Sequence, residues 1–340
     1  MPQRAEKKTP PIMIKVAVVG LGFMGQTHFG CYKNNPLAEV VAVGDSNPAK
    51  LESGAKVEGN IGSNDALDLS GVKTTTDIES LLADPEIELI DFSLPTRDHA
   101  KWTIAALNAG KHVLCEKPMA WTTEECDAVI EAQEKSGKYL LIGHCLRFWP
   151  QYVKAQELIA SGELGEVLYA RFFRAGGAPT WSGWLMNGAL SGGAVLDMHV
   201  HDVDTALWWF GKPDSIQTTG VTHKGLPIKV DTAWQYDSGP QVQIHGGWDS
   251  NGGGFTMGFE LTGTRNSLVW DSSKGDAMQL FGQDGERSID VSSDSAYQLE
   301  IDYLLECIDK GELPSRITPQ TSRLSVEMAR EELKQLGFEV

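Results

Sequence analysis

The sequence predicts an α/β protein of two domains, a doubly wound parallel sheet and then an α+β domain with a large, mostly antiparallel, open sheet. Up to residue 145, short apolar strand patterns alternate with helix patterns, as in a parallel sheet covered by helices. Beyond that point, strands follow one another through turns such as Asp284-Gly285, with few helices between them. The chain also has 340 residues, more than one hydrophobic core usually supports.

We expect a floppy tail over residues 1–13, a first domain over 14–145 and a second over 146–340. Predicted strands of the first domain lie at 16–19, 39–45, 73–76, 88–94, 111–115 and 138–144, and its helices at 77–83, 99–109 and 122–136, with a weakly patterned helix and loop at 52–70. The second domain has predicted strands at 166–174, 215–222, 230–236, 241–247, 256–262, 267–270, 277–281 and 287–291, and helices at 152–160, 297–310 and 321–336. One face of this sheet lacks covering helices, so we expect a homo-oligomer, a dimer or tetramer, built sheet to sheet.

The first predicted strand runs directly into Gly20, Gly22 and Gly25, with Phe23 and Met24 between the last two. The G-x-G-x-x-G spacing permits a tight turn, lets a pyrophosphate approach the backbone and aims the following helix N-terminus at the phosphates. This is the fingerprint of a Rossmann dinucleotide site. A glycine-rich turn without a ligand is the alternative.

Asp45 supports the dinucleotide interpretation. It ends the second predicted strand at the distance, about 20 residues beyond the glycines, where a carboxylate holds the adenosine ribose hydroxyls. Its charge disfavours a 2′-phosphate, and no Arg or Lys follows until Lys50, so NAD is expected over NADP. Asp45 also opens a turn, and the two roles are compatible.

Two further strand ends carry polar residues. Ser93 and Pro95 end one strand, with His99 just beyond, and Glu116-Lys117 ends the next. In an open α/β sheet ligands bind beyond the carboxyl ends of the strands, which favours a functional role here. A solvated turn is the alternative for each.

A candidate acid–base site lies in the stretch 191–211, which is predicted as a helix. At about 100° per residue, Asp197, His201, Asp204 and Trp208 share a stripe roughly a quarter-turn from the apolar core stripe. Neighbouring carboxylates orient an imidazole and raise its basicity, as a general base requires. A structural, hydrogen-bonded histidine is the alternative for His201. His199 lies nearly opposite, so a metal site built on these two histidines is not expected.

Composition excludes several classes of partner. The formal net charge of −17 argues against nucleic acid and anionic membranes, because both attract basic surfaces. No apolar run approaches the roughly 18 residues that cross a bilayer. The N-terminus lacks the apolar region of a signal peptide. The five cysteines are scattered without a C-x-x-C motif, which fits reduced thiols in a cytoplasmic protein and neither a disulfide frame nor a metal site.

With these motifs in place, the sequence resembles the glucose–fructose oxidoreductase / inositol dehydrogenase / rhizopine-catabolism (Gfo/Idh/MocA) oxidoreductase family over almost its whole length after the tail. The resemblance rests on the combination of the glycine fingerprint, Glu116-Lys117-Pro118, Arg147-Phe148, and Gly192-Gly193 followed by Asp197 and His201. The sequence departs from many relatives in having Ser-Gly-Gly-Ala where they have three glycines. Its extra His199 is unusual, and the resemblance assigns no role to the glycine-rich loop 246–254.

The resemblance implies an enzyme that transfers a hydride between a sugar or polyol carbinol carbon and NAD. His201 is implied as general acid/base, Lys117 as the group that binds the reacting oxygen and keeps the pKa of the base low, and Asp197 as the residue that fixes a neighbouring hydroxyl and the imidazole. Pro118 is a candidate to follow a cis peptide bond. The implied cofactor contacts are Gly20, Gly22, Phe23, Met24, Gly25, Asp45, Ser93, Pro95, His99, Glu116 and Lys117, and the implied substrate contacts are Lys117, Arg147, Trp184, Asp197 and His201.

Four other side chains are candidates for a substrate pocket. Trp181 and Trp248 could meet a sugar ring face, and Arg171 and His245 its hydroxyls. For each, core packing or solvent exposure is an equal alternative. Two other functions also stay open at this point. One is an NAD-using glycosidase or lyase that oxidises transiently with no net redox change. The other is a non-enzymatic dinucleotide-responsive regulator, which the presence of Lys117, Asp197 and His201 disfavours.

Overall fold

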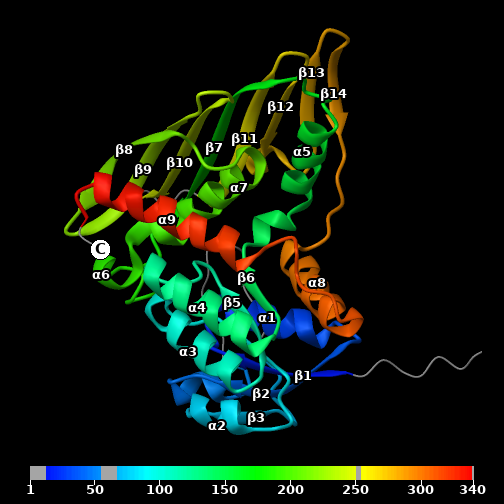
Figure 1. The fold of residues 1–340 in the computed structure, drawn as a ribbon, viewed down its shortest axis with the longest axis vertical. Coiled ribbons are helices and arrows are strands. Elements are labelled where there is room, and N and C mark those ends of the chain that lie inside the picture. The colour runs from blue at the N-terminus through cyan, green and yellow to red at the C-terminus, as the bar shows by residue number, and fades with distance from the viewer. Residues whose placement is uncertain (1–12, 55–66, 250–253, 339–340) are drawn as a thin grey trace, which may run out of the picture.

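The protein is described by a computed structural model over residues 13–54, 67–249 and 254–338. The tail predicted over 1–13 lies outside the described residues except for Met13. So do residues 55–66 of the stretch predicted as helix and loop, and residues 250–253 of the glycine-rich loop. Two sheets dominate the remainder, with the chain passing from the first to the second after β6 (Figure 1).

The first sheet is parallel throughout, as predicted, and has the strand order β3-β2-β1-β4-β5-β6 of a doubly wound nucleotide-binding fold. Its strands are β1 (Ile14–Val19), β2 (Ala38–Gly44), β3 (Lys73–Thr75), β4 (Leu89–Phe92), β5 (His112–Glu116) and β6 (Leu140–Gly143). Its helices are α1 (Phe23–Lys33), η1 (Pro48–Leu51), α2 (Ile78–Ala83), α3 (Thr96–Asn108) and α4 (Thr123–Ser136). Helix α3 begins at Thr96, earlier than predicted, so His99 lies in its first turn.

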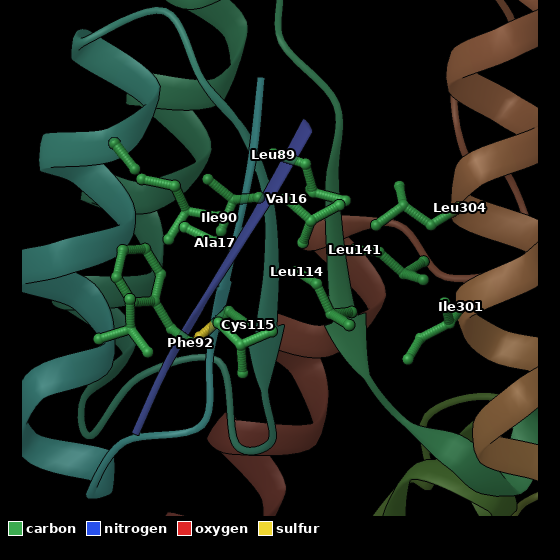
Figure 2. Close-up of a cluster of buried hydrophobic side chains, with 14 of the residues drawn as sticks. Val16, Ala17, Leu89, Ile90, Phe92, Leu114, Cys115, Leu141, Ile301 and Leu304 are labelled. Carbon is green, nitrogen blue, oxygen red and sulfur yellow. The ribbon is translucent and has the colours of Figure 1, made fainter. Parts of the chain in front are cut away.

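The core of the first sheet also includes a helix from the far end of the chain. Helix α8 (Ala296–Lys310) packs against α1, and its Ile301 and Leu304 are fully buried with the strands of the first sheet. Figure 2 shows both side chains pointing from α8 toward Leu141. The division at residues 145 and 146 stays a prediction, but the first core therefore draws on residues far beyond it.

The turn between β1 and α1 allows no side chains at two of its glycines. Gly20 has φ +92°, and a Cβ there would lie 2.3 Å from the Ser93 carbonyl oxygen. A Cβ on Gly25 would lie 1.8 Å from the carbonyl oxygen of Gly20. Real Cβ atoms do not approach backbone so closely, and so the turn and the first helix can pack only with glycine at these positions.

Gly25→Ala is expected to lower the free energy of unfolding by about 1–3 kcal/mol, because the added methyl forces backbone apart. Gly30→Ala is the matched control on the same helix. Nothing lies within 4 Å of a Cβ at Gly30, and Ala there should be neutral or add up to about 1 kcal/mol. Urea unfolding measures both. Equal effects of the two substitutions would contradict the packing described for the turn.

The second sheet has eight strands in the order β14-β13-β12-β11-β7-β10-β9-β8. Every neighbouring pair is antiparallel except β7 and β10, so the predicted mostly antiparallel sheet is confirmed. The strands are β7 (Val167–Gly177), β8 (Ser215–His223), β9 (Leu226–Gln235), β10 (Gln241–Asp249), β11 (Thr256–Gly263), β12 (Ser267–Asp271), β13 (Met278–Gly282) and β14 (Gly285–Ile289).

One face of the second sheet is covered by helices α5 (Pro150–Ala160), α7 (Val200–Phe210) and α9 (Pro319–Gln335) (Figure 1). Side chains on the covered face are buried, such as Phe172, whereas those on the other face are half-buried or exposed, such as Phe173 and Gln243. A sheet-to-sheet oligomer through this second face stays a prediction. Among the described residues, no helix combines the length and apolar character needed to cross a bilayer.

The stretch predicted as one helix over 191–211 is broken into three parts, so that prediction is wrong in detail. A short helix α6 (Gly188–Ser191) ends at Gly192 and Gly193, both with positive φ. A π-helical turn, η3 (Val195–His199), follows, and α7 begins only at Val200. A π-turn is wider than an α-turn and changes the direction of the side chains that it carries. Asp197 lies in this turn.

Candidate active site

The turn after β1 has the shape and polarity that a dinucleotide pyrophosphate requires. Gly22 caps α1 with no side chain, and nothing lies within 4 Å of the place where its Cβ would be. The first turn of α1, which includes Phe23 and Met24, carries no acidic residue. The helix N-terminus is therefore open to an anion, and NAD fits the residues present.

Asp45 is buried at the end of β2 and ties the glycine turn to it. One carboxylate oxygen, Oδ2, accepts a hydrogen bond of 2.8 Å from the Leu21 amide and lies 3.3 Å from Lys50 Nζ. The other, Oδ1, accepts from the Asn47 amide at 2.8 Å. Asp45 is thus both the turn residue and a fixed charge beside the glycine turn. Its contact with the ribose stays a prediction.

Asp45→Ser is expected to lower the preference for NAD over NADP, measured as the ratio of kcat/KM values, by about 10–100-fold. The substitution removes a charged acceptor worth about 1.5–3 kcal/mol and leaves Lys50 free to meet a 2′-phosphate. In the double variant Asp45→Ser/Lys50→Ala, the gain with NADP should disappear while the loss with NAD remains. An unchanged ratio in the single variant would mean that Asp45 does not face the ribose.

The next two strand ends meet through His99. Its Nδ1 lies 2.7 Å from the Pro118 carbonyl oxygen and its Nε2 lies 2.8 Å from the Leu94 carbonyl oxygen. Because both ring nitrogens face backbone oxygens and the residue is buried, His99 links the turn after β4 to the turn after β5. The direct cofactor contact of His99 stays a prediction, and both ring nitrogens already face backbone oxygens. Ser93 and Pro95 lie partly buried on the turn after β4.

Lys117 reaches from the first sheet to the π-turn beside α7. Its peptide bond to Pro118 is cis, as predicted, and its amide donates to Glu116 Oε2 at 3.1 Å. Its ammonium donates to the Asp197 carbonyl oxygen at 2.6 Å and lies 3.4 Å from Asp197 Oδ1. Trp248 donates to the other carboxylate oxygen of Asp197 at 3.3 Å. Two segments 80 residues apart are thus joined at one point.

His201 follows Asp197 by four residues and is partly buried, with an Nδ1 that has no hydrogen-bond partner among the described residues. Burial lowers the pKa of His201 well below its usual 6.5, and the positive charges of Lys117 and Arg174, together with His144, lower it further. The ring is therefore neutral at physiological pH and can accept a proton. The predicted role of Lys117 in keeping the pKa of the base low agrees with this electrostatic arrangement.

His144 was not identified from the sequence. It follows β6, is buried, and places Nδ1 3.6 Å from Asp204 Oδ2. Burial lowers the pKa of His144 to about 4, although Asp204 opposes this. The rule that ligands lie beyond the carboxyl ends of parallel strands could have pointed to it, because it holds the same position on β6 that Lys117 holds on β5.

Asp204 does not orient His201, so that prediction is wrong. Its carboxylate forms a two-pronged ion pair with Arg147, with N–O distances of 2.8 and 2.9 Å, and accepts from Ser325 at 2.8 Å. Arg147 is buried, and its remaining terminal nitrogen donates to the Arg316 carbonyl oxygen at 3.0 Å. All three guanidinium nitrogens donate to Asp204 or to Arg316, which argues against the predicted substrate contact of Arg147.

His199 lies away from the site, as predicted. It is fully buried beneath Gly246, where a Cβ would lie 2.8 Å from its ring nitrogen Nδ1. Its Nε2 lies 3.0 Å from Glu332 Oε2 of α9. His199 therefore joins the π-turn to α9 and the second sheet, which gives it a structural role.

The remaining pocket candidates divide between two places. Arg171 and His245 project from the uncovered face of the second sheet, where they pair with Glu260 at 3.3 Å and Asp231 at 2.7 Å. Strand alternation directs them away from Asp197, which favours the alternative of solvent exposure for both. Trp184, partly buried, and Trp181, 41% exposed, lie on the loop before α6.

The family models match both halves of the chain. The model described as "Oxidoreductase family, NAD-binding Rossmann fold" matches residues 14–144, and the GFO/IDH/MocA C-terminal domain matches residues 152–269. The chain belongs to the GFO/IDH/MocA oxidoreductase family. The predicted family, the fold class and NAD as cofactor are confirmed, as is the expectation of an oxidoreductase.

Relatives of this chain include enzymes named for sugars and polyols. A 1,5-anhydro-D-fructose reductase of Ensifer adhaerens is 33% identical over 205 residues, which are 58% of this chain and 61% of that protein. A scyllo-inositol 2-dehydrogenase (NAD(+)) of Bacillus subtilis is 27% identical over 320 residues, 88% of each. Among solved structures, a levoglucosan dehydrogenase in complex with NADH and levoglucosan shares the fold, with a TM-score of 0.83 and 20% identity over 95% of this chain and 97% of that one.

Proposed function

We propose that this protein transfers a hydride between a carbinol carbon of a sugar or cyclic polyol and NAD. The observation that carries the proposal is the junction of Lys117 with Asp197, because it places an ammonium, a carboxylate and the nearby His201 together. Lys117 comes from a strand end on the nucleotide-binding sheet, two strands from the glycine turn. Bound NAD supplies the hydride acceptor, and it supplies the donor in the reverse direction.

His201 acts as general base in this proposal. Its neutral ring takes the proton of the reacting hydroxyl, and gives one back in the reverse direction. Burial and the nearby positive charges hold the ring in the form that accepts a proton.

Lys117 binds the reacting oxygen. An ammonium has three N–H donors, and two of these point to Asp197, which leaves one for the substrate oxygen. The positive charge stabilises negative charge that develops on that oxygen as the proton leaves. Asp197, held by Trp248, fixes the ammonium and is placed to accept from a neighbouring hydroxyl.

The substrate class follows from the site and from the relatives. Acceptors and donors at Asp197, Lys117 and His201 suit adjacent hydroxyls, and Trp184 offers an aromatic surface for the C–H face of a ring. The relatives named above act on anhydrofructose, scyllo-inositol and levoglucosan, all cyclic polyhydroxy compounds. A sheet-to-sheet homo-oligomer and a cytoplasmic location are parts of the same proposal.

The test is a panel of scyllo-inositol, myo-inositol, levoglucosan, glucose and xylose, each mixed with the protein and NAD. The proposal expects reduced nicotinamide to accumulate with at least one compound and oxidised product to form in equal amount. Release of a leaving group from an aryl glycoside without net NADH would favour the glycosidase or lyase. If the protein binds NADH tightly but neither reduces NAD nor releases a leaving group, the regulator is favoured and the proposal is overturned.

A further inference from the structure

A buried ionisable cluster lies behind the turn that carries Lys117. It consists of His28 from α1, Asp91 from β4, Glu116 from β5 and Glu300 from α8, and we call it the His28 cluster. His28, Asp91 and Glu300 are fully buried, and Glu116 is 7% exposed. Three carboxyl groups and one imidazole thus share an interior site. It is formed by strands β4 and β5, which end at the proposed active site, and by helices α1 and α8.

Asp91, His28 and Glu116 form an unbroken chain of contacts to Lys117. His28 Nδ1 lies 2.9 Å from Asp91 Oδ2, and His28 Nε2 lies 3.3 Å from Glu116 Oε1. The other oxygen of Glu116 accepts the amide hydrogen of Lys117 at 3.1 Å. The imidazole therefore bridges two carboxylates, and the second of these holds the backbone from which the Lys117 ammonium projects.

The same chain reaches the cofactor turn from its other end. Helix α1, which carries His28, begins at Phe23, directly after Gly22. Ser93 donates from Oγ to Asp91 Oδ1 at 3.2 Å. The Ser93 carbonyl oxygen is also the atom that leaves no room for a Cβ at Gly20. His28 thus lies between the turn where the pyrophosphate is expected and the turn that carries Lys117.

Stability alone does not account for this cluster. Buried carboxyl groups are costly, and replacing a buried ion pair with apolar side chains is often neutral or stabilising. Glu300 is the clearest case, because neither of its carboxyl oxygens has a hydrogen-bond partner among the described residues. Burial raises the pKa of Glu300 well above its usual value, and Glu116 adds to this.

His28 is positively charged near neutral pH, as an imidazole between the carboxylates of Asp91 and Glu116 should be. Burial alone lowers the pKa of His28, but Asp91, Glu116 and Glu300 outweigh it and raise that pKa to about 9. Around neutral pH the ring therefore carries a proton on both nitrogens. Nδ1 donates to Asp91, whereas Nε2 forms an ion pair with Glu116 at 3.3 Å without a hydrogen bond. A neutral imidazole could serve only one of them as a donor.

We propose that His28 is a positioning residue that couples the dinucleotide-binding turn to Lys117 through Glu116. The inference rests on the proposed function in taking Lys117 as the group that binds the reacting oxygen. In this arrangement, dinucleotide binding at the start of α1 orders the Lys117 turn, and the substrate meets an ammonium already in place. His28 itself touches neither substrate nor cofactor.

The test compares wild type with His28→Gln, Glu116→Gln and the double variant. A displacement of about 1 Å at a reacting group costs about 10²-fold. We expect kcat to fall about 10–100-fold in each single variant, with little change in the KM for the substrate or in the Kd for NADH measured by fluorescence. The double variant should lose no more than the larger single loss, because both changes break one link.

Hydrogen exchange gives a second readout that does not depend on turnover. On adding NADH to the wild type, exchange should slow both in residues 14–25 and in residues 112–120. In His28→Gln, the first segment should still slow and the second should not. His112→Gln is the matched control, since it removes a partly buried imidazole from the opposite end of β5; it should keep both responses and the wild-type kcat.

The outcomes separate this inference from the proposed function. Suppose the wild type turns over and His28→Gln has the same kcat and the same exchange response to NADH. The positioning role would then be overturned, and the proposed function would stand. A wild type that reduces no NAD but shows the coupled exchange response, lost in His28→Gln, would overturn the proposed function and support the coupling. A loss of stability in His28→Gln with both NADH responses retained would mean that His28 is only structural.

Discussion

Lys117→Ala is expected to lower kcat by about 10²–10³-fold, the loss seen when a single donor to a developing oxyanion is removed. The structure gives the reason, since the Lys117 ammonium is held on Asp197 with one N–H left for the reacting oxygen. Lys117→Arg should not restore activity, because a planar guanidinium is larger and directs its donors differently. Steady-state kinetics with the substrate identified from the panel measures both variants.

Lys154→Ala is the control for this prediction. Lys154 lies on the surface of α5, where it pairs with Glu157 at 3.0 Å. Its loss removes a lysine charge without touching the site, and kcat should not change. A Lys117→Ala enzyme with the wild-type kcat would show that the reacting oxygen is bound by another group.

His201→Asn is expected to lower kcat by about 10²–10⁴-fold, because the general base for the hydroxyl proton is lost. The pH dependence gives a second expectation. The pKa of His201 is lowered, so the ring stays neutral as pH falls through 6.5. Wild-type kcat/KM for alcohol oxidation should therefore be flat across pH 6.5 and decline only at more acidic pH.

His223→Asn serves as the control, since His223 is exposed at the end of β8 and plays no part in the proposed chemistry. It should leave both kcat and the pH profile unchanged. A wild-type profile that falls through pH 6.5 would contradict the environment described for His201, and an active His201→Asn enzyme would contradict its role.

Local chemistry made most of the secondary structure predictable. The capping box of Thr122 with Glu125 marks the start of α4, and Asp77 accepts from two amides at the start of α2. The β-branched runs of the first sheet mark strands buried on both faces. These signals are local in the chain, so composition and spacing reveal them.

The parts that the sequence did not reveal depend on residues far apart in the chain. The carboxylate of Asp204 is taken by Arg147, 57 residues earlier, and no spacing rule foretells that pairing. Helix α8 joins the first core although the whole second sheet precedes it in the chain. The π-turn at Val195–His199 also departs from the α-helical periodicity on which the predicted stripe was based.

The site was predictable only in part for the same reason. The motifs pointed to Lys117, Asp197 and His201 as candidates, and the structure joins Lys117 to Asp197. Asp91 and His28 carry no local signal, because Asp91 lies within an apolar strand and His28 within a helix. Their importance appears only when α1, β4 and β5 are packed together.

The most direct test of the proposed chemistry is a crystal structure of the protein with NADH and the substrate or product found in the panel. It should show one substrate oxygen within hydrogen-bond reach of both Lys117 Nζ and the His201 ring, with the carbon that bears it facing C4 of the nicotinamide. A sugar or polyol bound elsewhere, or a nicotinamide ring that lies away from both residues, would contradict the account.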